Sequence, residues 1–141
     1  MITDSPRLTA ALDNDLIGFL TAVDGSGQPQ TSPVWFIRDG NDIVVYNKPD
    51  TPRLSSIATN PSVSFNLRGD RRARGAVTLE GTARREDYLQ PAKDFPGYVA
   101  KYGGEIERLG WTPDSFSGDY SVALRIVVTR ARSWGLEAVD G

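Results

Sequence analysis

The chain alternates between short apolar stretches and turn-forming residues, a pattern typical of antiparallel β-strands joined by hairpins. The clearest case is Ser62 to Leu67, where Val63, Phe65 and Leu67 fall at alternate positions and so face one side of a strand. β-Branched, aromatic and other apolar residues favour strands in five further stretches. These are residues 17–23, 30–38, 43–47, 76–84 and 121–132. The pattern therefore predicts six strands, most of them paired with a neighbour in sequence.

Apolar side chains spaced three or four residues apart predict helices in the remaining segments. A short helix begins near Ser5-Pro6, and a second covers residues 51–59. The segment 86–109 is expected to form two or three short helices, because Pro91, Pro96 and the pair Gly103-Gly104 interrupt it. Helices at the periphery of hairpin-linked strands predict a mainly β fold, a six-stranded antiparallel barrel in a single domain over residues 1–141.

The predicted barrel is too narrow to hold a ligand. Six short strands enclose an interior that their own side chains fill. A cofactor or substrate is therefore expected on the outside of the barrel or between two subunits.

Composition narrows the possible chemistry, because the chain has no histidine and no cysteine. Disulfides are excluded, as are zinc, copper or haem sites that need these ligands and mechanisms with a His or Cys at their centre. An enzyme of this composition is expected to use an organic cofactor on a small-molecule substrate. The net charge of −2 predicts no general attraction to nucleic acid. With no signal peptide and no membrane span in the sequence, we expect a cytoplasmic protein.

The segment Lys48 to Arg53 leads from a predicted strand into a helix and has the features of an anion site. Thr51 is placed as the N-cap and Pro52 as the first helical residue, so the first amides of the helix point outward beside Lys48 and Arg53. A phosphate group would suit this arrangement, and an ordinary surface helix start is the alternative. A cation at the second helical position opposes the helix dipole unless an anion binds, which favours the phosphate hypothesis.

Arginines gather in a second place, at positions 68, 71, 72 and 74 around Gly69-Asp70. They either hold an acidic group or form a solvated hairpin tip, and the second interpretation is the simpler one. Nucleic-acid binding is disfavoured because no aromatic residue lies between these arginines.

Two groups of aromatic residues have both a structural and a functional interpretation. Tyr98, Lys101 and Tyr102 lie on adjacent faces of a predicted helix, and packing with the hydroxyls at the surface is favoured over a role as proton donors. Trp35 and Trp134 either flank a flat ring or fill the core and a subunit interface.

Four stretches resemble a known family. They are IGFLTAVDGSGQPQTSPVWF, VVYNKPDTPRLSSIATNPSVSFNL, YVAKYGGEIERLG and YSVALRIVVTRARSW. Together they resemble the pyridoxamine-phosphate-oxidase-like split β-barrel superfamily, and within it the actinobacterial deazaflavin-dependent oxidoreductases that use coenzyme F420. The resemblance implies a homodimer that binds F420 between subunits and reduces an electron-poor substrate, such as an activated alkene or a quinone. An FMN-dependent oxidase or reductase and a non-catalytic flavin or deazaflavin carrier are the alternatives.

The resemblance also implies which residues contact the cofactor. The ring would lie along Thr31, Ser32, Pro33 and Val34, the cofactor side chain beside Tyr46, Asn47 and Lys48, and the phosphate at Thr51, Pro52 and Arg53. Arg72 and Arg74 would face the glutamate tail of F420, and Trp134 would close the ring pocket from the partner subunit. The proton donor is left open between Tyr98, Tyr102 and solvent.

Overall fold

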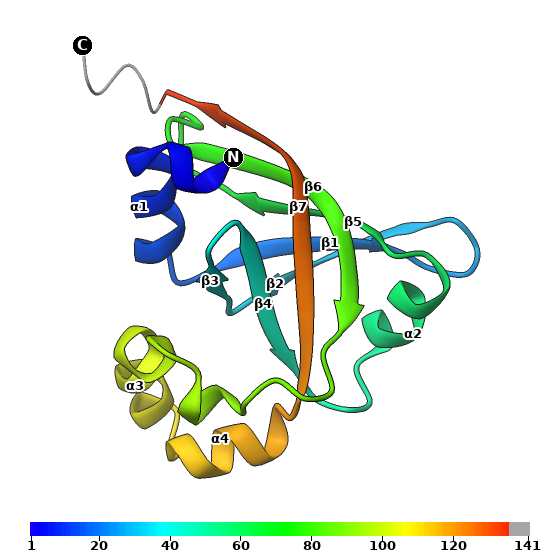
Figure 1. Cartoon of the computed structure of the whole chain (residues 1–141), viewed down its shortest axis with the longest axis vertical. Coiled ribbons are helices and arrows are strands. Elements are labelled where there is room, and N and C mark those ends of the chain that lie inside the picture. Colours follow the sequence, from blue (N-terminus) through cyan, green and yellow to red (C-terminus); the bar gives the residue numbers. More distant parts are fainter. Residues whose placement is uncertain (136–141) are drawn as a thin grey trace.

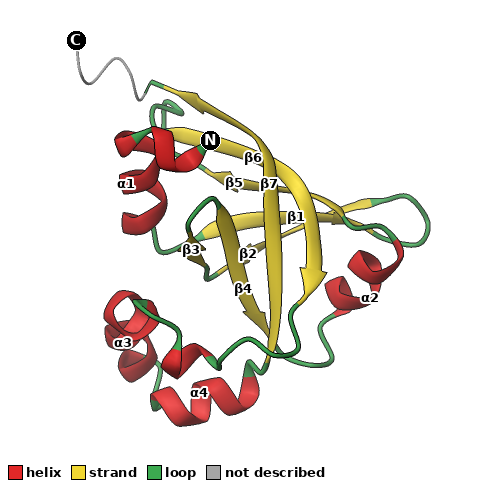
Figure 2. Ribbon diagram, viewed as in Figure 1, coloured by secondary structure: helices red, strands yellow, loops and turns green. Residues whose placement is uncertain are grey.

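The computed structural model describes residues 1–135, which form one strongly curved antiparallel sheet with helices around it (Figure 1). The strands are β1 (Gly18–Val23), β2 (Pro29–Val34), β3 (Ile37–Asp39), β4 (Asp42–Asn47), β5 (Ser62–Leu67), β6 (Ala76–Arg85) and β7 (Val122–Trp134). Their order across the sheet is β2-β1-β5-β6-β7-β4-β3. The helices are α1 (Pro6–Asn14), α2 (Pro52–Thr59), α3 (Tyr98–Arg108) and α4 (Pro113–Asp119), with short 3-10 turns η1 (Ile2–Asp4) and η2 (Ala92–Asp94). The predicted mainly β split barrel with peripheral helices is confirmed (Figure 2).

The predicted number of strands is wrong, because the described residues form seven strands and not six. The stretch expected as one strand over 30–38 breaks at Trp35 and Phe36, and its halves β2 and β3 lie at opposite edges of the sheet. Side chains of α3 take the place of a neighbouring strand at the break. The Phe36 N–H donates to the Tyr102 hydroxyl at 2.9 Å, and the Phe36 carbonyl accepts from Lys101 Nζ at 3.1 Å. The backbone can leave the sheet here because both of its buried polar groups keep a partner.

The inner face of the sheet is filled by apolar side chains, as predicted for a narrow barrel. Phe36 and Phe65 meet edge to face at the centre, with ring centroids 4.8 Å apart. A β-bulge between Glu80 and Gly81 bends β6 around this core, and a side chain at Gly81 would lie 2.1 Å from the Val127 carbonyl oxygen. The interior therefore leaves no room for a ligand, and the site must lie outside it.

A second apolar cluster packs the segment between β6 and β7 against the outside of β4. The pair Gly103-Gly104 does not interrupt α3 as predicted, because Tyr102 and Ile106 are buried on either side of the pair and anchor the helix. The tyrosines of α3 pack as expected, but their placement with hydroxyls at the surface is wrong. Tyr102 is fully buried, and its hydroxyl lies 2.7 Å from the Leu16 carbonyl. In the described part of the chain no helix has the length and apolar character needed to cross a bilayer.

Lys101 lies beside Tyr102 at the break between β2 and β3. Its Nζ donates to the carbonyls of Leu12 and Phe36, both at 3.1 Å, and sits 3.7 Å from the centroid of the Phe36 ring. Burial lowers the pKa of Lys101 from 10.5 to about 8, against the opposing effect of the nearby carboxylates of Asp13 and Asp15. This lysine therefore links the folding stability to pH in the alkaline range.

We expect the free energy of unfolding to rise between about pH 8 and pH 10. In this range the unfolded chain holds a lysine proton that the folded chain has lost, so raising the pH favours the folded state, by at most about 1.4 kcal/mol per pH unit. Above about pH 10 the trend reverses, because burial raises the pKa of Tyr46, Tyr98 and Tyr102 and only the unfolded chain then loses tyrosine protons. Urea unfolding across this range measures the effect. Lys101→Met should remove the rise, and parallel profiles for the two proteins would contradict the prediction.

Candidate functional site

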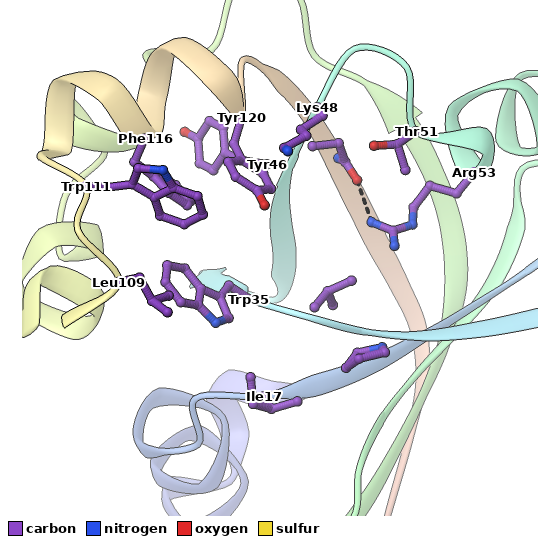
Figure 3. A pocket seen from close by; sticks show the side chains of 13 residues that line it. Ile17, Trp35, Tyr46, Lys48, Thr51, Arg53, Leu109, Trp111, Phe116 and Tyr120 are labelled. Carbon is purple, nitrogen blue, oxygen red and sulfur yellow. Dashed lines mark hydrogen bonds between the residues drawn. The ribbon is translucent and has the colours of Figure 1, made fainter. Parts of the chain in front are cut away.

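A pocket of about 510 Å³ lies outside the barrel, where the end of β4, the start of α2 and helix α4 meet (Figure 3). Its polar lining side chains are Tyr46, Asn47, Lys48, Thr51 and Arg53. The remaining lining residues are mostly apolar, and they are Ile17, Pro33, Val34, Trp35, Leu109, Trp111, Phe116 and Tyr120. The pocket thus has two cations and no carboxylate among its described lining residues, in a chain whose net charge is −2.

Arg53 is held in position at one side of this pocket by two neutral partners. Its Nη1 donates to Asn47 Oδ1 and its Nη2 donates to Ser32 Oγ, both at 2.7 Å. Asn47 is itself fixed, because it is buried and its Nδ2 donates to the carbonyls of Val45 at 3.0 Å and Val122 at 3.1 Å. The three residues come from β2, β4 and α2, so the guanidinium is aimed by three separate elements.

No carboxylate of the described residues pairs with Arg53, although its side chain is partly buried. Burial lowers the pKa of this guanidinium, because nothing nearby compensates for the loss of water around its charge. The N-terminus of α2 adds to the positive field, since Thr51 is the N-cap as predicted but its side chain makes no capping bond. An anion bound here would be stabilised by both groups.

A wall of stacked aromatic rings forms the other side of the pocket. Trp35 stacks on Tyr102 with centroids 4.6 Å apart and planes within 9°, and on Phe116 at 5.3 Å. Phe116 in turn stacks on Tyr120 at 4.6 Å, and Trp111 contacts both of these rings at 5.6 Å. Such a wall suits a flat apolar group. The pocket therefore combines an anion-binding side with an aromatic side.

A smaller pocket of about 410 Å³ adjoins the first between β1, β2 and α2. Thr51 and Arg53 line both pockets, so they stand at the junction of the two. Thr31 lines the smaller pocket and shares a hydroxyl–hydroxyl bond of 2.7 Å with Thr21 on β1. An extended ligand could occupy both pockets only by passing the guanidinium.

The structure brings together most of the residues that the sequence singled out. Those lining the main pocket are Pro33, Val34, Tyr46, Asn47, Lys48, Thr51 and Arg53, and those lining the adjoining pocket also include Thr31, Ser32 and Pro52. Their contact with a cofactor stays a prediction.

Arg72, Arg74 and Trp134 do not reach either pocket of their own chain. Arg74 pairs with Asp70 at 3.1 Å in the β5–β6 loop, and Trp134 lies at the far end of β7 beside Ala76. The near end of β7, at Val122, pairs with Asn47 of the site. These three residues could meet a cofactor only across a subunit interface, which stays a prediction.

The aromatic wall contributed by α4 was not predicted from the sequence. Phe116 and Tyr120 are four residues apart on a helix that begins at the capped residue Thr112, so they share one face. That spacing was visible in the sequence and could have marked the face. The position of this face opposite Arg53 could not be predicted from the sequence, because that position depends on how α4 packs against β4. The two tyrosines named as proton donors, Tyr98 and Tyr102, lie behind the wall and do not line the pocket.

Comparisons with known proteins agree with this fold. A sequence model of the pyridoxamine 5'-phosphate oxidase family (PNPOx_N) matches residues 5–135. The comparison with curated proteins returned no significant match. Three solved structures illustrate the range of ligands named for proteins of this fold.

One solved structure is named F420 reductase; it is 20% identical, with 87% of this chain and 94% of that chain covered and a TM-score of 0.64. A FAD-binding protein from Mesorhizobium loti is 20% identical over 87% of this chain and 88% of its own, with a TM-score of 0.63. HutZ, the haem storage protein from Vibrio cholerae, is 19% identical, with 94% of this chain and 97% of HutZ covered and a TM-score of 0.64. These likenesses establish the fold and leave the ligand open. The family match, which spans nearly the whole chain, shows that this protein belongs to the pyridoxamine 5'-phosphate oxidase family.

Proposed function

We propose that this protein is an oxidoreductase that binds coenzyme F420 and reduces a small electron-poor substrate, such as an activated alkene or a quinone. The observation that supports it most is Arg53, a partly buried guanidinium fixed by Asn47 and Ser32 with no carboxylate partner among the described residues. A phosphate group would supply the missing negative charge. F420 carries a phosphate and a flat ring, and the pocket offers the guanidinium of Arg53 for the phosphate and the β2 backbone at Pro33 and Val34 for the ring.

The residues present fit a flavin-type cofactor better than a haem. A haem is usually held by an axial His or Cys ligand, and the chain has neither. A phosphate-bearing cofactor needs only the guanidinium of Arg53, the hydroxyl of Thr51 and the amides at the start of α2. The resemblance of the four sequence stretches to the F420-dependent oxidoreductases supports F420, and FMN, which shares the need for a phosphate site, is the alternative.

In this proposal the chemistry of hydride transfer belongs to the bound deazaflavin, and the protein positions the reactants. Arg53 holds the phosphate, and the backbone of β2 at Pro33 and Val34 supports the ring. The aromatic side chains of the wall exclude water from the space where the substrate meets the ring, which strengthens every electrostatic contact there.

We also propose that the protein acts as a homodimer with the cofactor at the subunit interface. Two apolar side chains at the edge of the pocket, Ile17 and Leu109, are 41% and 48% exposed in the single chain. A second subunit would cover them and would place its own Trp134, which is 47% exposed, within reach of the site.

The proposal predicts that oxidised F420 quenches the intrinsic tryptophan fluorescence, because Trp35 and Trp111 line the pocket. Parallel titrations with FMN and haem, and with free tryptophan as the control for inner-filter effects, distinguish the three ligands. Tight FMN binding with no response to F420 would contradict the choice of cofactor. Reduced F420 should then be consumed on addition of a quinone or an enone, and its failure to react with any acceptor would favour a carrier function.

A further inference from the structure

The two cations of the main pocket are held in different ways. Arg53 is tied to Asn47 and Ser32, whereas Lys48 extends toward the ring of Tyr120, with Nζ 5.5 Å from the ring centroid (Figure 3). Among the described residues the Lys48 ammonium has no hydrogen bond and no ion pair. Lys48 therefore brings an uncompensated charge to the aromatic side of the pocket, apart from the proposed phosphate site.

Two carboxylates lie near Lys48 without pairing with it. Asp50 and Asp119 share an adjoining surface hollow with the lysine, but neither comes within the 4.0 Å of an ion pair. Neither carboxylate lines the main pocket. The ammonium is thus free to meet a negative charge that arises on the pocket side.

The other protic side chains of the pocket are poorly suited to that task. The Tyr46 hydroxyl donates to the Gln90 carbonyl at 2.7 Å, and burial raises its pKa. Both amide hydrogens of Asn47 are used in bonds to backbone carbonyls. Arg53 is assigned to the cofactor phosphate in the proposed function. Trp35, Thr51, Trp111 and Tyr120 remain as neutral donors, so Lys48 is the only remaining cation among the described lining residues.

Addition of a hydride to a conjugated carbonyl compound creates the charge that such a cation would meet. As the new C–H bond forms at the β-carbon, the electron pair of the C=C bond moves toward the carbonyl, and its oxygen becomes an enolate oxygen. A cation facing that oxygen lowers the barrier, because it interacts more strongly with the transition state than with the neutral substrate.

We propose that Lys48 binds the substrate oxygen on which negative charge develops, and that the substrates are planar apolar enones or quinones lying against the aromatic wall. The inference rests on the proposed function, since a reduced deazaflavin supplies the hydride and is itself oxidised by two electrons. The enolate oxygen takes a proton from the Lys48 ammonium, and water returns a proton to the resulting amine. For an enone, the enol so formed becomes the ketone in water.

The aromatic wall could hold a planar substrate with its oxygen close to the Lys48 ammonium. Trp111, Phe116 and Tyr120 stand together on the side of the pocket to which Lys48 extends. A flat ring or enone resting on these side chains would place its oxygen close to the ammonium, while its apolar body replaced water on the aromatic faces.

A phenolate is a stable mimic of the enolate and tests Lys48 without any cofactor. The protein would be titrated with para-nitrophenol over a range of pH, following the absorbance change that separates phenolate from phenol. We expect the native protein to bind the phenolate about tenfold more tightly than the phenol, equivalent to about one unit in the pKa of the bound ligand. In Lys48→Met most of this preference should be lost, and any remainder should disappear when Arg53, the other cation of the pocket, is replaced as well.

Lys93→Met is the matched control, because Lys93 is an exposed lysine that pairs with Asp114 at 2.8 Å and does not line the pocket. It should keep the phenolate preference of the native protein. Equal preference in the native protein and Lys48→Met would overturn the inference, and so would failure of both ligand forms to bind. Loss of the preference in Lys93→Met as well would show a general charge effect and would also overturn it.

The test separates this inference from the proposed function. Binding of F420 that depends on Arg53, together with a phenolate preference that does not depend on Lys48, would overturn only the role of Lys48. A Lys48-dependent phenolate preference in a protein that does not bind F420 would support the anion-facing role and would contradict the choice of cofactor.

Discussion

Arg53→Ala is expected to weaken the binding of F420, or of FMN if that is the cofactor, by about a hundredfold or more. Removing a partly buried charged partner from a hydrogen-bonded anion costs about 2–5 kcal/mol, and each 1.4 kcal/mol is about a factor of ten in affinity. The loss should be large because Asn47 and Ser32 fix this guanidinium in position, whereas the other cation of the pocket, Lys48, extends toward the ring of Tyr120. Fluorescence titration of the purified variant measures it.

The fold itself should tolerate this change. Burial lowers the pKa of Arg53, which means that the folded protein holds this charge at a cost when no anion is bound. The variant also loses the bonds to Asn47 and Ser32, and because these two effects oppose each other we expect the melting temperature of the ligand-free variant to stay close to that of the native protein. Arg108→Ala serves as the control, because Arg108 pairs with Glu105 on the surface of α3 and does not line the pocket. An Arg53→Ala protein with native affinity would rule out this residue as the phosphate site.

Arg53→Lys gives a second comparison at the same position. A lysine keeps the charge but lacks the forked donors that reach Asn47 and Ser32 together. We expect its affinity to lie between those of the native protein and the alanine variant, because charge alone is retained.

The parts of the fold that sequence could predict are those whose pattern is local. Alternation of apolar and polar residues identified β5. Turn-forming residues between the strands predicted over 30–38 and 43–47 indicated a hairpin, which the structure places between β3 and β4, where Gly40 has a φ of 62°. The break at Trp35 and Phe36 was not predictable, because both residues favour strands. It depends on two side chains of α3 that lie more than sixty positions away along the chain.

The candidate site likewise has one side that follows from a local sequence pattern and one side that depends on contacts between distant segments. Its cationic side comes from the segment Lys48 to Arg53, so it could be predicted from a helix start and its neighbouring charges. Ser32 and Asn47 were predicted as ring and side-chain contacts, but their bonds to Arg53 depend on the pairing of distant strands. The aromatic side requires α3 and α4 to pack on β4, and only the structure shows this.

Loss of Tyr102 should destabilise the fold strongly, because this residue supports the break between β2 and β3. Its hydroxyl accepts from the buried Phe36 N–H, and Tyr102→Phe would leave that donor without a partner, at a cost of about 1–3 kcal/mol. Tyr102→Ala would also remove a fully buried ring, which adds about 3–5 kcal/mol. Since natural domains are stable by about 5–15 kcal/mol, the alanine variant should lose a large part of its free energy of unfolding. Urea unfolding followed by circular dichroism measures both changes.

The two Tyr102 variants should also separate support of the fold from support of the pocket. Trp35 lines the pocket and stacks on the Tyr102 ring at 4.6 Å, so Tyr102→Phe keeps the stacking and should keep native cofactor affinity while losing stability. Any folded Tyr102→Ala protein should also lose affinity for the cofactor, since Trp35 would lose the Tyr102 ring that stacks on it. Tyr88→Phe is the control, because Tyr88 is fully exposed and its hydroxyl should contribute nothing. If Tyr102→Phe proved as stable as Tyr88→Phe, the hydroxyl would not be what holds the chain at Phe36, and the break would have to rest on ring packing and on Lys101 alone.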